Sequence, residues 1–450
     1  MPIRFWERPA RVHLIGIGGV GMAGLARLLL QKGFSVSGSD RHPNRLTRDL
    51  EMQGVTFYSG HDPANLKSLP DWAIRTPAVG EGNPEVDGLR NRQIPLFVRG
   101  QVLAAFANTR HGVAIAGAHG KTTTTAMLAA IVHPEGAGYA VGGETALPGG
   151  VADAGTKENF VYEADESDGT LAHYAPEVGV LTHVEWDHVE RFRCEDALLQ
   201  CYRVFAQRCG QLWIKEGDLL AEQVCKGLAG VRRVGDSGAA DLRLMEAVSD
   251  PEGQQVKFCM GGDIYSFRIL LPGHHNAWNA LMAVAAAAQL GISPEQSCEA
   301  LQGFKGVARR FQIEERRGIR LIQDYAHHPT EIRAVMESAR ALKPKRLWVV
   351  FQPHRFSRTR HLLREFSEAL QGVDRLALLP VYAASEVSTQ GVGTPRLAEV
   401  CRECGQRVEL YESRFELQEV WVPELQAGDV VLILGAGDVE ALQSEMTSFL

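Results

Sequence analysis

The chain alternates short apolar runs with segments whose apolar residues have helical spacing. Near the N-terminus, the pattern predicts a buried strand at 12–15, a glycine turn at 16–21, a helix at 22–31 and a second strand at 34–37. A strand, a tight turn, a helix and another strand make a βαβ unit, in which the two strands lie parallel in one sheet.

The same succession starts again at residue 112. A strand is predicted at 113–116, a glycine turn at 117–120 and a helix at 121–131. Two more strands are predicted at 160–163 and 178–182, and an alanine-rich helix at 277–289.

A third start follows residue 305. Apolar runs at 347–351, 375–379 and 430–434 predict strands separated by helix-length segments. We therefore expect three α/β domains, with junctions near residues 99–110 and 303–308.

The composition narrows the function classes. The 450 residues are 45% hydrophobic and 22% charged, which is typical of a globular protein. The 47 Lys and Arg against 54 Asp and Glu give a formal charge of −7, so we expect no nucleic-acid partner. Without a run of 18 apolar residues, we expect no membrane insertion, and a leader peptide is not predicted at the N-terminus.

The eight cysteines favour a cytoplasmic protein. They are scattered, and only Cys401 and Cys404 form a C-x-x-C pair. A common zinc site would need a second pair at suitable spacing, so we expect two reduced cysteines on a helix.

The strongest chemical signal is the second glycine turn, residues 117–122. Glycines let backbone N–H groups converge on phosphate oxygens at a helix start. Lys121 is then placed to reach the β- and γ-phosphates, and Thr122 to ligate Mg²⁺. The loop has two residues between its glycines where the usual phosphate loop has four, so a plain turn with an exposed lysine is the alternative.

Acidic and imidazole groups follow the next two strands, at 163–168 and 185–188. The carboxyl ends of parallel strands meet at one edge of a sheet, and carboxylates there are natural Mg²⁺ ligands. Either cluster alone is more often a solvated loop. Beside a phosphate loop, they indicate a nucleotide site.

The first glycine turn has the G-x-G-x-x-G spacing at Gly16, Gly18 and Gly21, and Asp40 ends the next strand. This pattern is typical of dinucleotide binding, with Asp40 able to reach a ribose hydroxyl. The pyrophosphate of any nucleotide-linked substrate satisfies the same loop, and a tight βα turn without a ligand is a further alternative.

Two polar stretches follow strands of the third domain, at 324–331 and 354–358. Their arginines and histidines can clamp a carboxylate through paired hydrogen bonds, although each histidine alone is more often packed or on the surface. The adjacent Arg309 and Arg310 are either a solvated pair or a phosphate contact.

The assembled motifs, at 13–22, 120–125, 163–168, 324–332 and 351–359, resemble those of the Mur ligase family, the ATP-dependent ligases that build the peptide of peptidoglycan. The resemblance is strongest to members that join L-alanine to the carboxylate of UDP-N-acetylmuramate through an acyl phosphate. Members that attach recycled tripeptide share most motifs, and residues 351–359 favour the former.

The resemblance implies a Rossmann-like UDP-sugar domain at 1–105, a central ATP-binding P-loop domain at 106–304 and a Rossmann-like amino-acid domain at 305–450. It implies ATP and Mg²⁺, and either a monomer or a homodimer. The UDP-sugar residues are then Gly16, Gly18, Gly19, Val20, Gly21, Met22, Asp40 and Arg99. The ATP residues are Gly117, Ala118, His119, Gly120, Lys121, Thr122, Thr123, Asn276, Asn279 and Arg310. The Mg²⁺ ligands are Thr122, Glu163 and His188, and the amino-acid residues are Tyr325, His327, His354, Arg355 and Arg358. Lys121 is expected to be catalytic, with His188 or His327 as the base.

The chain departs from the family pattern at several positions. His183 stands where Asn is usual, and Gln323 stands where a second Asp often precedes Asp324. Two other functions use the same motifs differently. An NAD-dependent oxidoreductase would use the first glycine turn, and a non-catalytic protein would bind ATP without releasing phosphate.

Overall fold

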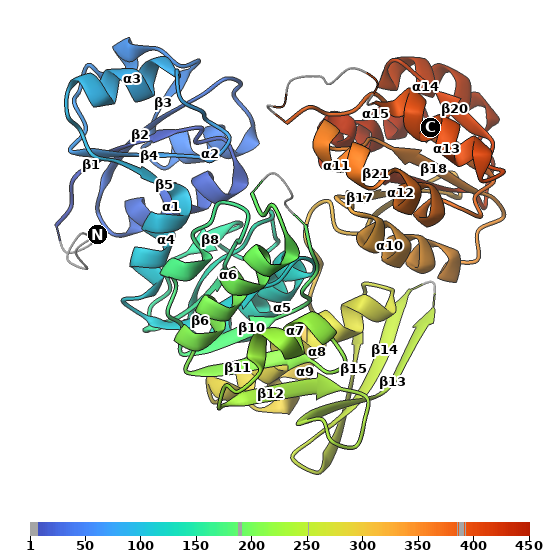
Figure 1. Ribbon diagram of the computed structural model, residues 1–450, viewed down its shortest axis with the longest axis horizontal. Helices are drawn as coiled ribbons and strands as arrows, with labels where there is room; N and C mark the ends of the chain where they lie inside the picture. The colour runs from blue at the N-terminus through green and yellow to red at the C-terminus, as the bar shows by residue number, and fades with distance from the viewer. Residues whose placement is uncertain (1–7, 188–190, 251, 385, 387–390, 392) are drawn as a thin grey trace.

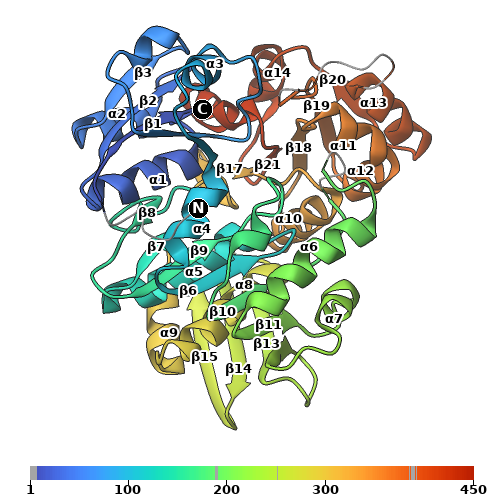
Figure 2. The ribbon, with the colours of Figure 1, turned by 60° about the vertical axis from the view of Figure 1, so that its left-hand side comes forward.

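The computed structural model describes residues 8–187, 191–250, 252–384, 386, 391 and 393–450 (Figure 1). It has three lobes in chain order, and each is built around its own sheet. Figure 2 shows that the first and third lobes lie on the same side of the central one.

The N-terminal sheet is parallel in every pairing and has the order β3-β2-β1-β4-β5. Its strands are β1 (Arg11–Ile15), β2 (Ser35–Asp40), β3 (Thr56–Ser59), β4 (Trp72–Arg75) and β5 (Leu96–Val98). Its helices are α1 (Val20–Gln31), α2 (Arg45–Met52) and α3 (Pro84–Asn91). Helix α1 buries Leu25 and Leu29 in the core formed with Val12 and Leu14, as its helical apolar spacing predicts. The strand order is that of a Rossmann-like unit.

The central sheet has the order β15-β14-β13-β12-β11-β10-β6-β9-β7-β8. Its strands are β6 (His111–Ala116), β7 (Gly138–Ala140), β8 (Ala152–Asp153), β9 (Asn159–Glu163), β10 (Val178–Leu181), β11 (Gln211–Lys215), β12 (Val231–Gly235), β13 (Leu242–Asp250), β14 (Gly253–Met260) and β15 (Asp263–Ile269). Its helices are α5 (Lys121–Val132), α6 (Glu195–Arg208), α7 (Leu219–Cys225), α8 (His274–Gln289) and α9 (Pro294–Gln302). The middle of this sheet is parallel, whereas β13, β14 and β15 form an antiparallel extension. The alanines of α8 are buried in the same core as α5, and their small side chains let the two helices pack closely.

The C-terminal sheet has the order β16-β17-β21-β18-β19-β20, and only the β16–β17 pairing is antiparallel. Its strands are β16 (Gln312–Arg316), β17 (Ile319–Asp324), β18 (Leu347–Phe351), β19 (Arg375–Leu378), β20 (Val408–Leu410) and β21 (Val430–Leu434). Its helices are α10 (Pro329–Ala341), α11 (Phe356–His361), α12 (Leu363–Ala369), α13 (Thr394–Glu403), α14 (Arg414–Trp421) and α15 (Ala441–Phe449).

The fold prediction is confirmed: the structure is a three-domain α/β protein with mostly parallel sheets. The predicted strands and helices occur within a few residues of their expected bounds. The antiparallel extension of the central sheet was not among the predicted elements. Cys401 is buried on α13, and Cys404 directly follows that helix and is exposed; both thiols are free. In the part of the chain that the structure describes, no helix is long and apolar enough to cross a membrane.

The domain boundaries that we propose, 1–105, 106–304 and 305–450, fall in segments between the sheets. Helix α4 (Arg99–Ala107) joins the first two sheets, and α9 ends at Gln302, shortly before the third begins.

Candidate active site

The predicted site residues lie beyond the carboxyl ends of parallel strands. In the central sheet, Ala116 at the end of β6 is level with Leu181 at the end of β10, and Ile115 is level with Glu163 of β9. This register places the phosphate loop, the Glu163 cluster and the segment after β10 at one edge of the sheet.

Two positions of the phosphate loop, 117 and 120, have room only for glycine. Gly117 has φ +128°, and a Cβ there would lie 2.5 Å from Thr182 Oγ1. The loop is held against the segment after β10, because Ala118 N donates to the His183 carbonyl at 2.7 Å. At Gly120, with φ +82°, a Cβ would lie 2.5 Å from Asn279 Oδ1.

Asn279, on α8, therefore lies beside the loop, and Asn276 contacts it from the preceding turn of the helix. Asn276 Nδ2 donates to the Pro272 carbonyl at 2.8 Å, and Asn279 Nδ2 donates to Asn276 Oδ1 at 3.3 Å. Both side chains are buried and are oriented by these hydrogen bonds.

Lys121 begins α5 and is held by an acidic neighbour. Its Nζ lies 3.0 and 3.1 Å from the two Glu166 oxygens and donates to the Gly117 carbonyl at 2.5 Å. Burial by itself lowers the pKa of Lys121, but the charges of Glu166, Asp165 and Glu163 raise it overall. The lysine is therefore a fixed cation facing the loop.

Thr122 and Glu163 form an oxygen pair that fits Mg²⁺. Thr122 Oγ1 donates to Glu163 Oε2 at 2.9 Å, and Gly142 N donates to the same oxygen at 3.1 Å. Burial raises the pKa of Glu163 despite the nearby Lys121, so its carboxylate gains from an added cation. A hydroxyl and a carboxylate are hard donors suited to this ion. The third predicted ligand, His188, lies outside the described residues.

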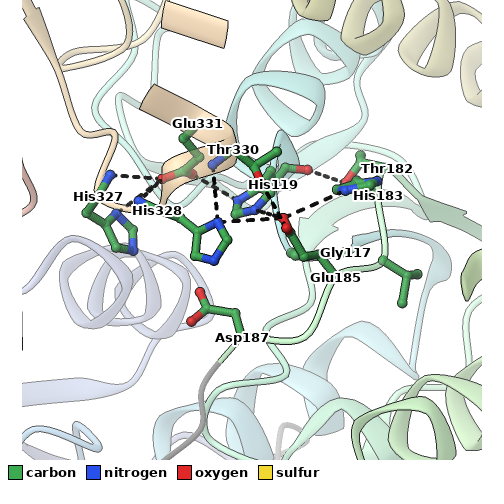
Figure 3. A network of polar contacts seen from close by, with 12 residues as sticks. Gly117, His119, Thr182, His183, Glu185, Asp187, His327, His328, Thr330 and Glu331 are labelled. Atoms are coloured by element: carbon green, nitrogen blue, oxygen red, sulfur yellow. Dashed lines mark hydrogen bonds and ion pairs between the residues drawn. The ribbon is translucent and has the colours of Figure 1, made fainter. Parts of the chain in front are cut away.

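A charged network joins the loop to the C-terminal domain (Figure 3). His119 Nε2 lies 2.8 Å from Glu185 Oε2, and its Nδ1 lies 3.2 Å from Glu331 Oε1. Thr330 Oγ1, on α10, donates to Glu185 Oε1 at 2.8 Å. Burial lowers the pKa of His119, but Glu331 and Glu185 raise it to about 9, so the ring is a cation between two carboxylates. Glu185 in turn has its pKa lowered to about 2, because His119 and His328 outweigh its burial.

The predicted amino-acid residues lie where the C-terminal domain meets the central one. His327 and His354 rings are 5.6 Å apart, and His354 stacks on Tyr382 at 5.7 Å. Arg355 has φ +72° and donates its N–H to the Tyr382 carbonyl at 2.8 Å.

Arg358 links the two domains through a buried ion pair. Its Nη2 lies 3.0 and 3.1 Å from the two oxygens of Asp187, and both side chains are buried. This contact joins positions 171 residues apart.

Tyr325 and Arg310 are placed together near the network. The Arg310 guanidinium lies 5.1 Å from the centre of the Tyr325 ring and 3.9 Å from Glu331. His327 Nδ1 faces the Tyr325 carbonyl at 3.0 Å, so this nitrogen carries the proton in the neutral ring. Burial lowers the pKa of His327 to about 3.

In the N-terminal domain, the first glycine loop is closed by Asp40. Gly18 N donates to Asp40 Oδ2 at 2.9 Å, and Asn44 Nδ2 donates to the Gly18 carbonyl at 3.0 Å. The predicted Gly19, Val20 and Met22 lie at the start of α1, beside this loop. Asp40 thus stabilises the conformation of the loop. The sequence predicted a ribose-binding role for Asp40 and did not predict this contact with Gly18.

Arg99 lies directly over the same loop. A Cβ on Gly21 would lie 2.5 Å from Arg99 Nη1. Arg99 also pairs with Asp165 at 3.5 Å and Asp168 at 4.0 Å, in the acidic segment of the central domain. Burial lowers the pKa of Arg99, but these two carboxylates raise it overall.

The structure places three carboxylates that had no individually predicted role, Glu166, Asp187 and Glu331, against Lys121, Arg358 and His119 respectively. All three lie within or beside the polar stretches that the sequence singled out. The polar stretches thus indicated where these carboxylates lie, but the spacing of residues along the chain could not predict which carboxylate pairs with which cation.

Three family models match the chain in succession. They are the Mur ligase family catalytic domain at residues 11–111, the Mur ligase middle domain at 115–287 and the Mur ligase glutamate ligase domain at 309–437.

Two curated relatives that match nearly the full chain carry the same name. The UDP-N-acetylmuramate–L-alanine ligase of Anaeromyxobacter sp. is 37% identical over 99% of both chains. That of Myxococcus xanthus is 37% identical over 98% of this chain and 95% of its own. Among solved structures, the Thermotoga maritima UDP-N-acetylmuramate-alanine ligase has a TM-score of 0.84 and 27% identity, covering 98% of this chain and 99% of its own. A murein peptide ligase of Psychrobacter arcticus, 24% identical with a TM-score of 0.73 and 98% of each chain covered, shares the fold.

Proposed function

The chain belongs to the Mur ligase family, and we propose that it joins L-alanine to the carboxylate of UDP-N-acetylmuramate, with cleavage of ATP to ADP and phosphate, in peptidoglycan precursor synthesis. The observation that carries this proposal is the pairing of a phosphate loop with the Thr122–Glu163 oxygen pair at one sheet edge, in a chain similar to such ligases over its whole length.

Lys121 acts on the first step, in which the muramyl carboxylate attacks the γ-phosphorus of ATP and ADP leaves. Two anions must approach each other, so the protein supplies mainly position and positive charge. Glu166 holds the Lys121 ammonium beside the loop. The Lys121 ammonium would also pair with the β- and γ-phosphates of ATP. Arg310 would add a positive charge from the C-terminal domain.

Thr122 and Glu163 would hold Mg²⁺. His188, which lies outside the described residues, is the third ligand that we propose. The ion would neutralise charge on the β- and γ-phosphates. Asn276 and Asn279 would bind the adenine side of ATP, next to Gly120 of the loop.

The second step attacks the acyl phosphate with the L-alanine amine. A tetrahedral intermediate forms, phosphate leaves, and the amide remains. A base must take the ammonium proton. His327 has its Nε2 lone pair available when Nδ1 donates to the Tyr325 carbonyl, but its lowered pKa makes it a weak base. His188 is the alternative.

The amino-acid site is formed by Tyr325, His327, His354, Arg355 and Arg358. Arginines bind carboxylates through paired N–H groups, and here Arg358 does so with Asp187. The UDP-sugar binds at residues 16–22, with Arg99 bridging this loop and the central domain. A closed arrangement of the three domains excludes water, which would otherwise hydrolyse the acyl phosphate.

A coupled phosphate-release assay tests the proposal. It contains UDP-N-acetylmuramate, ATP, Mg²⁺ and, in separate reactions, L-alanine, glycine, L-serine or the recycled tripeptide. We expect phosphate release that depends on both the sugar and L-alanine. Faster turnover with tripeptide would instead make the chain a recycling ligase, and ATP binding without release would make it a non-catalytic protein.

A further inference from the structure

One carboxylate oxygen of the interdomain network is surrounded by imidazole nitrogens. Glu185 Oε2 lies 2.8 Å from His119 Nε2, 3.6 Å from His328 Nδ1 and 3.8 Å from His183 Nε2. The ligand atoms of His119, Glu185 and His328 all lie within 4.8 Å of one another. Tetrahedral Zn²⁺ places neighbouring ligand atoms roughly 3.3 Å apart, so small side-chain movements would bring these atoms to one ion.

Three of these four groups have an outer partner that fixes their orientation, whereas His328 Nδ1 accepts from Thr330 N at 3.4 Å at the start of α10. The other nitrogen of His119 faces Glu331 at 3.2 Å, and the other nitrogen of His183 faces Asp218 at 2.8 Å. The other oxygen of Glu185 accepts from Thr330 at 2.8 Å. Outer carboxylate and hydroxyl partners of this kind orient the ligands of metal sites.

The surroundings limit access of water. The side chains of His328 and His119 are 5% and 13% exposed, and that of Glu185 is 30% exposed. The groups come from three segments: the phosphate loop, the segment after β10 and the residue before α10. Figure 3 shows His119, His183 and His328 grouped around Glu185.

We propose that His119, Glu185 and His328 form a binding site for a transition-metal dication such as Zn²⁺, with His183 next to it. Imidazole nitrogens with one carboxylate favour Zn²⁺, whereas the oxygen pair of Thr122 and Glu163 favours Mg²⁺. The two sites therefore take different ions. The proposed ligase reaction needs no ion at this second site, which shares His119 with the phosphate loop.

The ligands belong to both domains, so a bound ion links the phosphate loop to the start of α10. Metal binding at His119 Nε2 releases the proton of that nitrogen to water. The ion then bonds to both His119 Nε2 and the Glu185 carboxylate, which face each other directly in the structure. His183, where the family usually has Asn, adds a nitrogen at this position.

Metal titration of the full chain tests this site. The protein is stripped with a chelator, its exposed thiols are alkylated, and saturating Mg²⁺ is added to fill the oxygen site. Co²⁺ is then titrated while visible absorption is recorded, because four- and five-coordinate Co²⁺ absorbs much more strongly than the octahedral ion. Zn²⁺ affinity follows from competition with Co²⁺.

We expect one equivalent of Co²⁺ with strong bands, displaced by Zn²⁺. His328→Ala, His119→Gln and Glu185→Gln should each weaken binding at least ~10-fold, and His183→Asn should weaken it less. His173→Ala, at an exposed histidine of the central domain, should bind as the unaltered chain does. Circular dichroism shows whether each variant is folded, and the conservative Glu185→Gln and His183→Asn keep the comparison usable if His328→Ala unfolds.

Octahedral-type absorption alone, or equal affinity in Glu185→Gln and the unaltered chain, would overturn the proposal. The network would then be a set of ion pairs between domains. This outcome does not depend on ligase activity, so it is distinct from a failure of the proposed function.

Discussion

At the scale of single residues, the site is a set of opposite charges fixed close together. Lys121, Arg358 and His119 each face a carboxylate that the sequence places elsewhere in the chain. Such pairs are expensive to bury unless their geometry is good, and removing one partner leaves the other uncompensated.

Lys121→Ala should lower kcat by at least ~10²–10³-fold, since one charged contact to the transition state contributes about 2.7–4 kcal/mol. Phosphate release measures the effect. Lys226→Ala, at an exposed lysine of the same domain, is the control and should keep full activity. Activity of Lys121→Ala within twofold of normal would contradict the role given to this lysine.

At the scale of elements, turns are defined by backbone positions that side chains cannot occupy. Gly117 and Gly217 both have positive φ, +128° and +77°. Only at Gly117 would a Cβ meet other atoms, 2.5 Å from Thr182 Oγ1 and 2.8 Å from the His183 carbonyl.

Gly117→Ala should therefore distort the phosphate loop and weaken ATP binding at least ~10-fold. The positive φ should in addition lower the stability of the fold, because an alanine there carries ~1–3 kcal/mol of backbone strain. Gly217→Ala carries the strain without the clash, so it should lower stability slightly and leave the ATP affinity unchanged. Calorimetric titration with ATP compares the two. Equal ATP affinities in both variants would show that the loop tolerates the methyl group.

Strand pairing in the C-terminal sheet includes a charge cluster on β19 and β20. Glu409 accepts from the Arg375 side chain at 2.8 Å and from Tyr411 Oη at 2.6 Å. Burial by itself raises the pKa of Glu409, but Arg375, Tyr411 and Trp421 lower it from 4.5 to about 2.

A carboxylate with a lowered pKa stabilises the fold while it is ionised. Its contribution is complete above pH 4.5 and is lost as the pH falls towards 2. Glu409→Gln should therefore lower the denaturation midpoint at pH 7, and the difference from the unaltered chain should shrink between pH 4.5 and 3. Glu419→Gln, at an exposed site, should show no such convergence. A pH-independent difference for Glu409→Gln would argue against the charge cluster.

At the scale of the whole molecule, polar contacts between described residues connect the central domain to both of the others. Arg27 and Gln31 of α1 reach the Ala152–Asp153 strand, and Arg358 and Thr330 reach the segment after β10. The contacts of Arg358 and Thr330 thus lie beside residues assigned to the proposed reaction, whereas those of Arg27 and Gln31 lie towards the far end of α1 from its glycine loop.

Arg358→Ala removes one member of this buried ion pair, which costs ~3–5 kcal/mol in comparable pairs. We expect looser docking of the C-terminal domain, seen as a larger radius of gyration by small-angle scattering, and a kcat/KM for L-alanine reduced at least ~10-fold. Arg364→Ala, whose side chain is 85% exposed, should change neither quantity. If Arg358→Ala changed neither the radius of gyration nor kcat/KM, the Arg358–Asp187 pair would have no role in holding the domains together.

The sequence by itself determined the parallel strands, the two glycine turns and the position of the phosphate loop. These features follow from short-range rules: apolar runs form buried strands, and glycine permits tight turns at helix starts. The residues of the second turn and of the polar stretches could therefore be identified from the order of amino acids alone.

Only the tertiary structure decided which charges meet. The pairing of Arg358 with Asp187, of Lys121 with Glu166 and of His119 with Glu331 depends on how separate segments and domains pack. The antiparallel extension of β13, β14 and β15 also depends on long-range pairing. Local patterns carry no information on which groups meet across 45 or 171 positions of the chain, because packing of the whole core sets those distances.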